Sequence, residues 1–299
     1  MRSPVFAKHM PFYVAAVLAV FCAGVWSAVY VQAPFAFAQH PPQLLFAVLD
    51  VGQGDALYIE SPTGVQVLVD GGPGDALLRA LPGVMPALDR SIDAIIETHP
   101  DADHIGGFVG FLQRYEVGVF ISPGIPKSTA TARALEQEVS EFAVPRVIAR
   151  RGMSLDIGGG ARLDILYPDH DVSNVPSDKV NEGGIVVRLV YGQSEALLMA
   201  DVGKGVETQL LLLDGEALHS DILKVGHHGS RFSSGEEFVT AVSPTVALIS
   251  VGAKNTYGHP TQAALAALQN VGANILRTDQ KGTIRCFSDG AAFQCAGER

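Results

Sequence analysis

One six-residue segment constrains the fold of this 299-residue chain more than any other. It runs from His99 to His104 and holds two histidines and two aspartates, directly after residues 92–98, which are expected to form a buried strand. Imidazole and carboxylate groups together suit zinc or manganese. An ordinary polar loop with Asp103 as a helix N-cap is the alternative interpretation. The chain is therefore expected to fold so that a polar loop with metal-binding side chains stands at the end of a buried strand.

Short apolar runs separated by turn residues predict a strand-rich protein. The first half holds expected strands at residues 44–50, 56–61, 65–70, 92–98, 117–122 and 144–149, then a hairpin over 154–167 and a loop over 169–181. The second half holds residues 185–191, 196–200, 222–225, 245–250 and 274–277 and a terminal hairpin across 288–290. Helices are expected at residues 105–114, 129–142, 206–213, 236–242 and 261–270. Two such halves predict two sheets packed face to face, with helices outside.

Polar residues also follow several of the later predicted strands. Asp201 follows one strand, His227 and His228 follow the next, and His259 lies between a strand and a helix. Each of them alone would be an ordinary helix cap or a surface histidine. Together they indicate one active site, because sites are often built from residues at strand ends and on loops.

Residues 11–31 form an uncharged apolar run that is long enough to span a membrane. Basic residues precede this run and no lysine or arginine follows it until Arg79, so the positive-inside rule puts the rest of the chain outside the cytoplasm. Ala36-Phe37-Ala38 resembles a signal-peptide cleavage site, so a secreted protein is the alternative. Residues 1–42 are expected to be a membrane anchor or signal peptide with a linker, and residues 43–299 the domain that carries the candidate site.

The chain is acidic, with a net charge of −10. Because two bases and no acid precede Asp50, the remainder carries 19 bases and 31 acids, a charge of −12. Such a charge argues against nonspecific electrostatic wrapping of nucleic acid. It does not exclude an enzyme that acts on phosphodiesters, since bound metal ions can supply the positive charge.

Six motifs together resemble the metallo-β-lactamase superfamily, and within it the hydrolase domains of ComEC-type DNA-uptake channel proteins. They keep the family's order over about residues 44–289, and they are DVGQGD from Asp50, DGG from Asp70, THPDADHIGG from Thr98, LMAD ending at Asp201, LKVGHHGS from Leu223 and NTYGHP from Asn255. The resemblance implies an α/β (α+β) class protein with a four-layer αββα sandwich, which the transmembrane helix expected at residues 11–31 would precede. It also implies two divalent metal ions, zinc or manganese, at the edge between the sheets.

The resemblance assigns roles to individual residues. The implied metal ligands are His99 and Asp101 for one ion, Asp103, His104 and His227 for the other, and Asp201 as the bridge. His228 and His259 would line the substrate side, either of them a proton donor to the leaving oxygen, and Asp103 would orient the attacking hydroxide. Residues expected to support these ligands or to touch substrate are Asp50, Gln53, Asp55, Asp70, Asn181, Ser230 and Asn255.

Two departures from the family pattern concern the first metal. The common motif is His-x-His-x-Asp-His, and Asp101 occupies the place of its second histidine, a change that ComEC-like chains share. The additional carboxylate shifts preference toward manganese or weakens zinc binding. The family's separate histidine before Asp201 is not evident, and His170 and Asn181 are the candidates in that interval. We therefore expect the first metal site to be the weaker one.

These features predict an extracytoplasmic metal-dependent phosphodiesterase with DNA as its expected substrate. A single predicted membrane span cannot form a DNA channel, so a role in uptake would need a separate channel partner. Two alternatives stay open: a metallohydrolase of another ester, such as a phosphocholine ester or a lactone, and a noncatalytic module that binds DNA or a partner.

Cys286 and Cys295 flank the terminal hairpin. An extracytoplasmic location would permit a disulfide between them. A two-residue turn would set the two cysteines diagonally rather than opposite each other, so the sequence leaves their pairing open.

Overall fold

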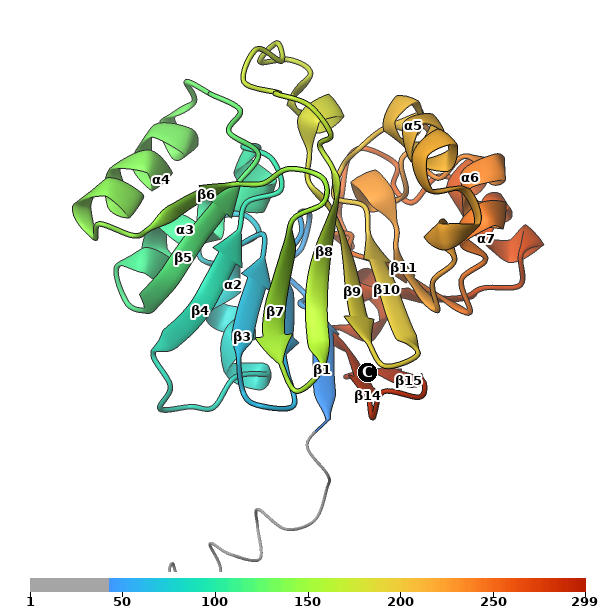
Figure 1. Ribbon diagram of the computed structural model, residues 1–299, viewed down its shortest axis with the longest axis horizontal. Helices are drawn as coiled ribbons and strands as arrows, with labels where there is room; N and C mark the ends of the chain where they lie inside the picture. Colours follow the sequence, from blue (N-terminus) through green and yellow to red (C-terminus); the bar gives the residue numbers. More distant parts are fainter. Residues whose placement is uncertain (1–42) are drawn as a thin grey trace, which may run out of the picture. The chain divides into compact units, whose positions relative to one another are not determined.

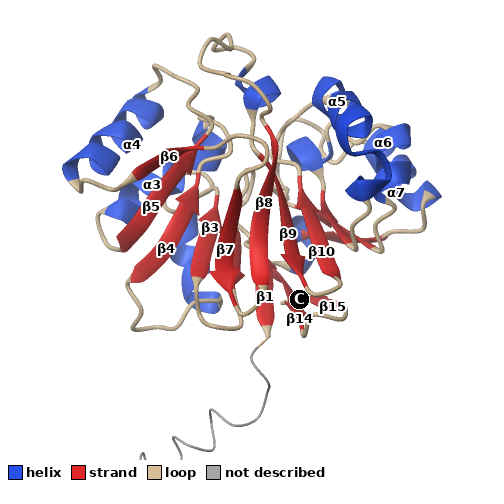
Figure 2. Cartoon of the chain, viewed as in Figure 1, coloured by secondary structure: helices blue, strands red, loops and turns tan. Residues whose placement is uncertain are grey.

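Two β-sheets lie face to face, and helices cover the outer side of each (Figure 1, Figure 2). The computed structural model describes residues 43–299, which form one compact unit. The expected membrane anchor or signal peptide in residues 1–42 lies outside the described residues. The described part therefore has the layered αββα arrangement that the family resemblance implies.

Each sheet combines antiparallel and parallel strands. The first has the order β15-β14-β1-β2-β3-β4-β5-β6, with bounds β1 Leu44–Val48, β2 Leu57–Glu60, β3 Gln66–Val69, β4 Ser91–Ile96, β5 Glu116–Ser122, β6 Arg146–Ile148, β14 Ile284–Ser288 and β15 Phe293–Gly297. The second has the order β13-β12-β11-β10-β9-β8-β7, with bounds β7 Ser154–Gly158, β8 Ala161–Tyr167, β9 Val186–Tyr191, β10 Ser194–Leu198, β11 Ile222–Lys224, β12 Val246–Ile249 and β13 Asn274–Arg277. Strands β3 to β6 are mutually parallel, as are β10 to β13. The carboxyl ends of each parallel set therefore lie at one edge of its sheet, where sites of α/β proteins are commonly found.

The helices divide between the two outer faces (Figure 2). Those against the first sheet are α2 Ala76–Ala80, α3 Ala102–Leu112 and α4 Ala130–Glu141. Those against the second are α5 Lys204–Asp214, α6 Glu236–Val242 and α7 Gln262–Asn270. The connections hold α8 Thr278–Lys281 and the 3-10 turns η1 Leu81–Gly83, η2 Val180–Gly183, η3 Gly215–Leu218 and η4 Gly226–Gly229. Within residues 43–299, every helix is too short or too polar to cross a bilayer.

The core follows from the two-residue period of the strands. On β1, Leu44, Phe46 and Val48 face the second sheet and pack in the central cluster between the sheets. The intervening Ala47 and the following Leu49 face the helices and pack in the outer cluster. Because successive side chains of a strand point to opposite faces, a strand that is covered on both sides reads as a continuous apolar run.

Helix α3 begins earlier than the sequence predicted, at Ala102 rather than at residue 105. Asp103 and His104 therefore lie in its first turn and not on a loop, and the N-cap residue is Asp101 instead of Asp103. Asp101 has an extended backbone, and its carbonyl accepts hydrogen bonds from the N–H groups of His104 and Ile105. Helices α2 and α8 and the turn η2 also form where no regular element was expected.

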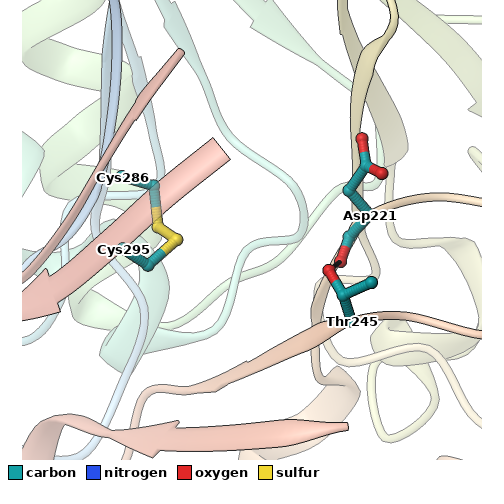
Figure 3. The surroundings of a disulfide bond; sticks show 4 residues. All are labelled: Asp221, Thr245, Cys286 and Cys295. Atoms are coloured by element: carbon teal, nitrogen blue, oxygen red, sulfur yellow. Dashed lines mark hydrogen bonds between the residues drawn. A yellow bond between two sulfur atoms is a disulfide. The ribbon is translucent and has the colours of Figure 1, made fainter. Parts of the chain in front are cut away.

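The terminal hairpin also departs from the prediction. β14 pairs with β1, so the hairpin belongs to the first sheet instead of the sheet formed by the second half. Its connection spans residues 289–292 instead of two residues, which sets Cys286 directly opposite Cys295. The two cysteines form a disulfide, with their Cα atoms 4.0 Å apart (Figure 3). The buried Cys286 also packs in the core between the sheets.

Candidate metal centre

Polar residues from both halves of the chain meet where the parallel strands end. The segment after β4 contributes His99 and Asp101, and the first turn of α3 adds Asp103 and His104. From the second sheet come Asp201 after β10, His227 and His228 in η4 after β11, and His259 before α7. The strand ends therefore gather residues that lie more than 150 positions apart in the sequence.

Close packing of glycines holds the start of α3 against the loops after β1 and β3. A Cβ atom on Gly107 would lie 2.0 Å from the carbonyl oxygen of Gly71, and one on Gly54 would lie 2.1 Å from that of Asp103. Both positions therefore require glycine. The N–H of Gly71 donates to the carbonyl of His104 at 2.6 Å, which fixes the helix start beside the cluster.

Among residues 43–299, buried polar atoms without hydrogen-bond partners converge at the centre of the cluster. They are the Nε2 atoms of His99, His104 and His228 and the Oδ1 of Asp201. The Nε2 atoms of His104 and His228 lie 3.4 and 3.5 Å from Asp201 Oδ2, and that of His228 lies 3.6 Å from Asp103 Oδ2. Ligand atoms of His99, His104 and Asp201, and likewise of Asp103, His104 and His228, lie within 4.8 Å of one another. Leaving such buried groups unpaired is unfavourable, so this donor set fits divalent cations.

The ring of His104 is oriented by Asp70. The Nδ1 of His104 lies 2.8 Å from Asp70 Oδ2, and Asp70 also accepts from the N–H and the hydroxyl of Thr98 at 2.8 and 2.7 Å. The Thr98 hydroxyl lies 3.0 Å from Nδ1 of His99. Carboxylates behind ligating histidines fix the ring and leave the other nitrogen for the metal, so Asp70 has the supporting position expected from the sequence.

The ring of His228 is oriented by a second chain of contacts. Its Nδ1 lies 3.0 Å from the carbonyl oxygen of Ser250 and 3.4 Å from Oδ1 of Asp55. The other oxygen of Asp55 accepts from Nζ of Lys224 at 2.6 Å, and both groups of that ion pair are buried. Asp55 thus has a supporting position, while Lys224 and Ser250 are parts of the site that sequence reasoning missed.

The charges of the cluster shift the pKa values of its members. Burial alone would lower the pKa of His104, but the carboxylates of Asp201 and Asp70 raise it well above its ordinary value. Burial would also lower the pKa of His228, but the carboxylate of Asp201 raises it to about 10. Burial would raise the pKa of Asp201, but His228 and His104 hold it well below its usual range. A divalent cation would replace protons in this network, because ligating imidazoles are neutral.

Asp101, the residue in place of the family's second histidine, has two neighbours. Its Oδ2 lies 3.6 Å from Nε2 of His99, and its Oδ1 accepts from Nζ of Lys127. Burial would raise the pKa of Asp101, but the neighbouring His99 and Lys127 side chains keep it below its ordinary value. Lys127, in the loop before α4, was not expected from the sequence, and its ammonium group adds a positive charge beside the first metal position.

His227 and His259 form the outer part of the cluster. The backbone of both His227 and His228 is left-handed, with φ of 48° and 54°, and their rings are 81° apart. His227 Nε2 lies 3.7 Å from Asp201 Oδ2, with its side chain 30% exposed. The ring centroid of His259 lies 5.7 Å from that of His227. Strained backbone of this kind is often found at functional sites.

The remaining expected residues divide between the site and its surroundings. Asn255 closes the loop that carries His259. The Nδ2 amide of Asn255 donates to the carbonyls of Gly252 and His259, and its Oδ1 accepts from the His259 N–H. Gln53 accepts from the N–H of Gly252 at 3.2 Å. Ser230 accepts from the N–H of Phe232 and has the place of a turn residue.

Three other candidates have contacts with residues outside the cluster. Asp50 pairs with Arg299 at 2.8 Å. His170 is exposed and pairs with the neighbouring Asp169. Asn181 lies in η2, and its carbonyl accepts from Gly184 at 3.2 Å.

Two facing sheets with outer helices and a His/Asp cluster at the strand ends define a metal-dependent hydrolase architecture. The family model of the metallo-beta-lactamase superfamily matches residues 49–253, and the chain belongs to that superfamily. The superfamily resemblance predicted from the six motifs is confirmed.

Curated relatives agree with the ComEC-type resemblance. ComE operon protein 3 of Bacillus subtilis is 31% identical over 80% of this chain and 32% of its own length. Competence protein ComA of Neisseria gonorrhoeae is 29% identical over 80% of this chain and 31% of its own length. Recombination protein 2 of Haemophilus influenzae is 28% identical over 83% of this chain and 29% of its own length. The chain therefore spans about a third of the length of these relatives.

Solved structures share the fold. Igni18, a metallo hydrolase from Ignicoccus hospitalis, superposes with a TM-score of 0.53 at 15% identity, covering 81% of this chain and 98% of Igni18. The diiron β-hydroxylase CmlA from Streptomyces venezuelae superposes with a TM-score of 0.51 at 18% identity, covering 83% of this chain and 54% of CmlA. At these identities the likeness concerns the fold alone.

Proposed function

We propose that this chain is a metal-dependent phosphodiesterase that cleaves DNA outside the cytoplasm. The observation that carries the proposal is the convergence of three buried imidazole nitrogens on Asp103 and Asp201. The names of the relatives, a competence protein and a recombination protein among them, support DNA as the substrate.

The donor atoms suggest how two ions would be held. His99, Asp101 and Asp201 would bind one ion, and Asp103, His104, His228 and Asp201 the other. The geometry favours His228 over His227 for the second ion, because the Nε2 of His228 is buried and unpartnered while His227 stands at the rim. When bound, two divalent cations would neutralise the phosphate oxygens and acidify water. The carboxylates of Asp101, Asp103 and Asp201 favour manganese.

We propose that two residues of the chain, Asp103 and His259, take part in proton transfer. The side chain of Asp103 is 39% exposed, so it can reach both the cluster and an attacking water. Burial, together with the neighbouring His227, lowers the pKa of His259, whose Nδ1 is buried without a partner. A bound phosphodiester would bring negative charge beside this ring and raise its pKa, which suits a donor to the leaving oxygen.

The proposed location rests on residues 1–42 and on the Cys286–Cys295 disulfide. The disulfide supports an oxidising compartment. The apolar run at residues 11–31 would anchor the chain, with cleavage as a signal peptide as the other outcome. The names of the competence relatives support a DNA-uptake context, in which we propose a channel protein as the partner.

A substrate panel tests the function. The purified chain would be metal-depleted, reloaded with Mn²⁺ or Zn²⁺, and assayed on bis(p-nitrophenyl) phosphate, single-stranded DNA, a phosphocholine ester and nitrocefin. We expect turnover of bis(p-nitrophenyl) phosphate and DNA with Mn²⁺ and no turnover of nitrocefin. Turnover of nitrocefin or of the phosphocholine ester, with bis(p-nitrophenyl) phosphate and DNA untouched, would contradict the proposal.

A further inference from the structure

A groove with a volume of about 730 Å³ opens beside Asp103, between the start of α3 and the start of α4. It is continuous with the metal centre, because Asp103 belongs to both. Representative lining residues are Gln53, Gly74, Ala102, Thr131, Ala134 and Tyr257.

The chemistry of the groove is nearly neutral. Within the described residues, Asp103 is the only charged side chain that lines it. A phosphate group would find no cation there, so the backbone of a nucleic acid has its favourable position at the metal centre instead. Several lining residues have small side chains. Gln53, whose Oε1 accepts a hydrogen bond from the Gly252 N–H, can donate from its Nε2 amide. These features suit an uncharged ligand with polar edges.

Tyr257 provides an aromatic surface at the rim of the groove. Its side chain is 69% exposed, although a large aromatic ring usually gains from burial. One side of the ring stacks on His259, with centroids 5.8 Å apart and planes 24° apart. The side-chain bonds of Asn255 brace the loop that carries both rings. The ring is thus held in place before any ligand arrives.

We propose that this groove binds a nucleobase next to the scissile phosphate and that Tyr257 stacks on that base. The inference rests on the proposed phosphodiesterase function and narrows its substrate to single-stranded or frayed nucleic acid, since a base inside a duplex is not free to enter. Stacking of a base on an aromatic side chain is tolerant of sequence, so Tyr257 determines the substrate class and not a base sequence.

Two fluorescent oligomers test the inference, a pentathymidylate and a pentamer of abasic tetrahydrofuran nucleotides with the same phosphodiester backbone. The full chain loaded with Mn²⁺ should cleave the pentathymidylate with a kcat/KM roughly 5- to 150-fold higher than that for the abasic pentamer. Most of this difference should come from a lower KM for the pentathymidylate. Tyr257→Ala should remove this preference by lowering kcat/KM for the pentathymidylate while leaving the abasic pentamer unchanged. Tyr257→Phe should keep the preference. Anisotropy measured in EDTA should rank the two oligomers in the same order.

Phe142→Ala is the matched control, because Phe142 is 50% exposed and caps the far end of α4. It should leave both oligomers unchanged. An equal loss on both oligomers in Tyr257→Ala would overturn the inference, since Tyr257 would then act through His259 and not on a base. Equal cleavage of both oligomers by the unaltered chain would overturn the inference and leave the proposed function standing. Cleavage of neither would sink the proposed function itself.

Discussion

Lys224 is a buried cation whose Nζ contacts Asp55 at 2.6 Å behind His228. Lys224→Met would leave the Asp55 carboxylate buried without its cation. Removing one partner of a buried ion pair lowers the free energy of unfolding by about 3–5 kcal/mol. Urea unfolding of the metal-free protein, followed by circular dichroism, would measure this loss.

The double variant Lys224→Met with Asp55→Asn separates the ion pair from the packing. It removes both charges, so it should recover part of the stability that the single variant loses. A single variant as stable as the unaltered chain would show that Asp55 is not held by this pair.

Glu97 is buried immediately before the ligand segment. Burial, with a smaller effect from Asp70, raises the pKa of its carboxyl to about 8. Because this pKa lies above that of the unfolded chain, the folded state binds the extra proton. Its stabilising effect is present below about pH 4.5 and is lost as the pH rises toward 8.

The chain should therefore lose stability on the order of a few kcal/mol between pH 5 and pH 8.5 through this group, and Glu97→Gln should lose less. Urea midpoints of both proteins at the two pH values provide the measurement. Parallel pH profiles would show that Glu97 is not the group responsible.

At this scale the sequence could predict the candidate ligands and the supporting residue Asp70, but not the buried partner of Asp55. His99, Asp103 and His104 stand together in one motif. Lys224 pairs with Asp55 across a separation of 169 residues, and only the folded sheets bring the two together. The choice between His227 and His228 likewise depends on the left-handed backbone of η4, which carries no recognisable sequence signal.

At the scale of elements, most strands were predictable from apolar runs with turn residues between them. The start of α3 was misjudged because HPDADH resembles a polar loop, whereas the hydrogen bonds from His104 and Ile105 to Asp101 begin the helix there. The place of the terminal hairpin was not predictable from local pattern. It depends on the pairing of β14 with β1, two strands that lie at opposite ends of the domain's sequence.

The disulfide closes this hairpin and stabilises the edge of the first sheet. Replacing Cys286 and Cys295 by serine removes a cross-link with a sequence separation of 9 and should lower the free energy of unfolding by about 2–3 kcal/mol. Dithiothreitol should shift the urea midpoint of the unaltered chain and leave that of the double variant unchanged. Equal midpoints for the oxidised chain and the double variant would contradict this role.

At the scale of the whole molecule, the acidic net charge of the chain is compatible with the proposed nucleic-acid substrate. The residues from Asp50 onward carry a net charge of −12. Several of the acids lie in the cluster, where divalent ions would reverse the local charge. A nearly neutral groove with an exposed tyrosine would bind a nucleobase through stacking, so binding would depend less on a basic protein surface. For the proposed phosphodiesterase, we expect this combination to favour short, single-stranded substrates.

The orientation of the chain in the membrane has its own test. If residues 11–31 anchor it with the amino terminus inside, protease added to intact cells should degrade the domain at residues 43–299. A cytoplasmic marker protein should survive the same treatment. Protection of the domain would contradict the proposed orientation, and release of the domain into the medium would indicate cleavage of a signal peptide.

The central claim is that His99, His104, His228 and the neighbouring aspartates form a metal centre. Elemental analysis of the purified chain and of Asp201→Asn tests it most directly, with Asp171→Asn as a control at an exposed loop carboxylate. We predict about two divalent ions per chain in the unaltered protein and the control, as expected for a dinuclear site, and the loss of at least one in Asp201→Asn. Equal thermal unfolding of the variants in EDTA would show that folding is intact. A chain that binds no divalent metal, or an Asp201→Asn variant with unchanged metal content, would contradict the account.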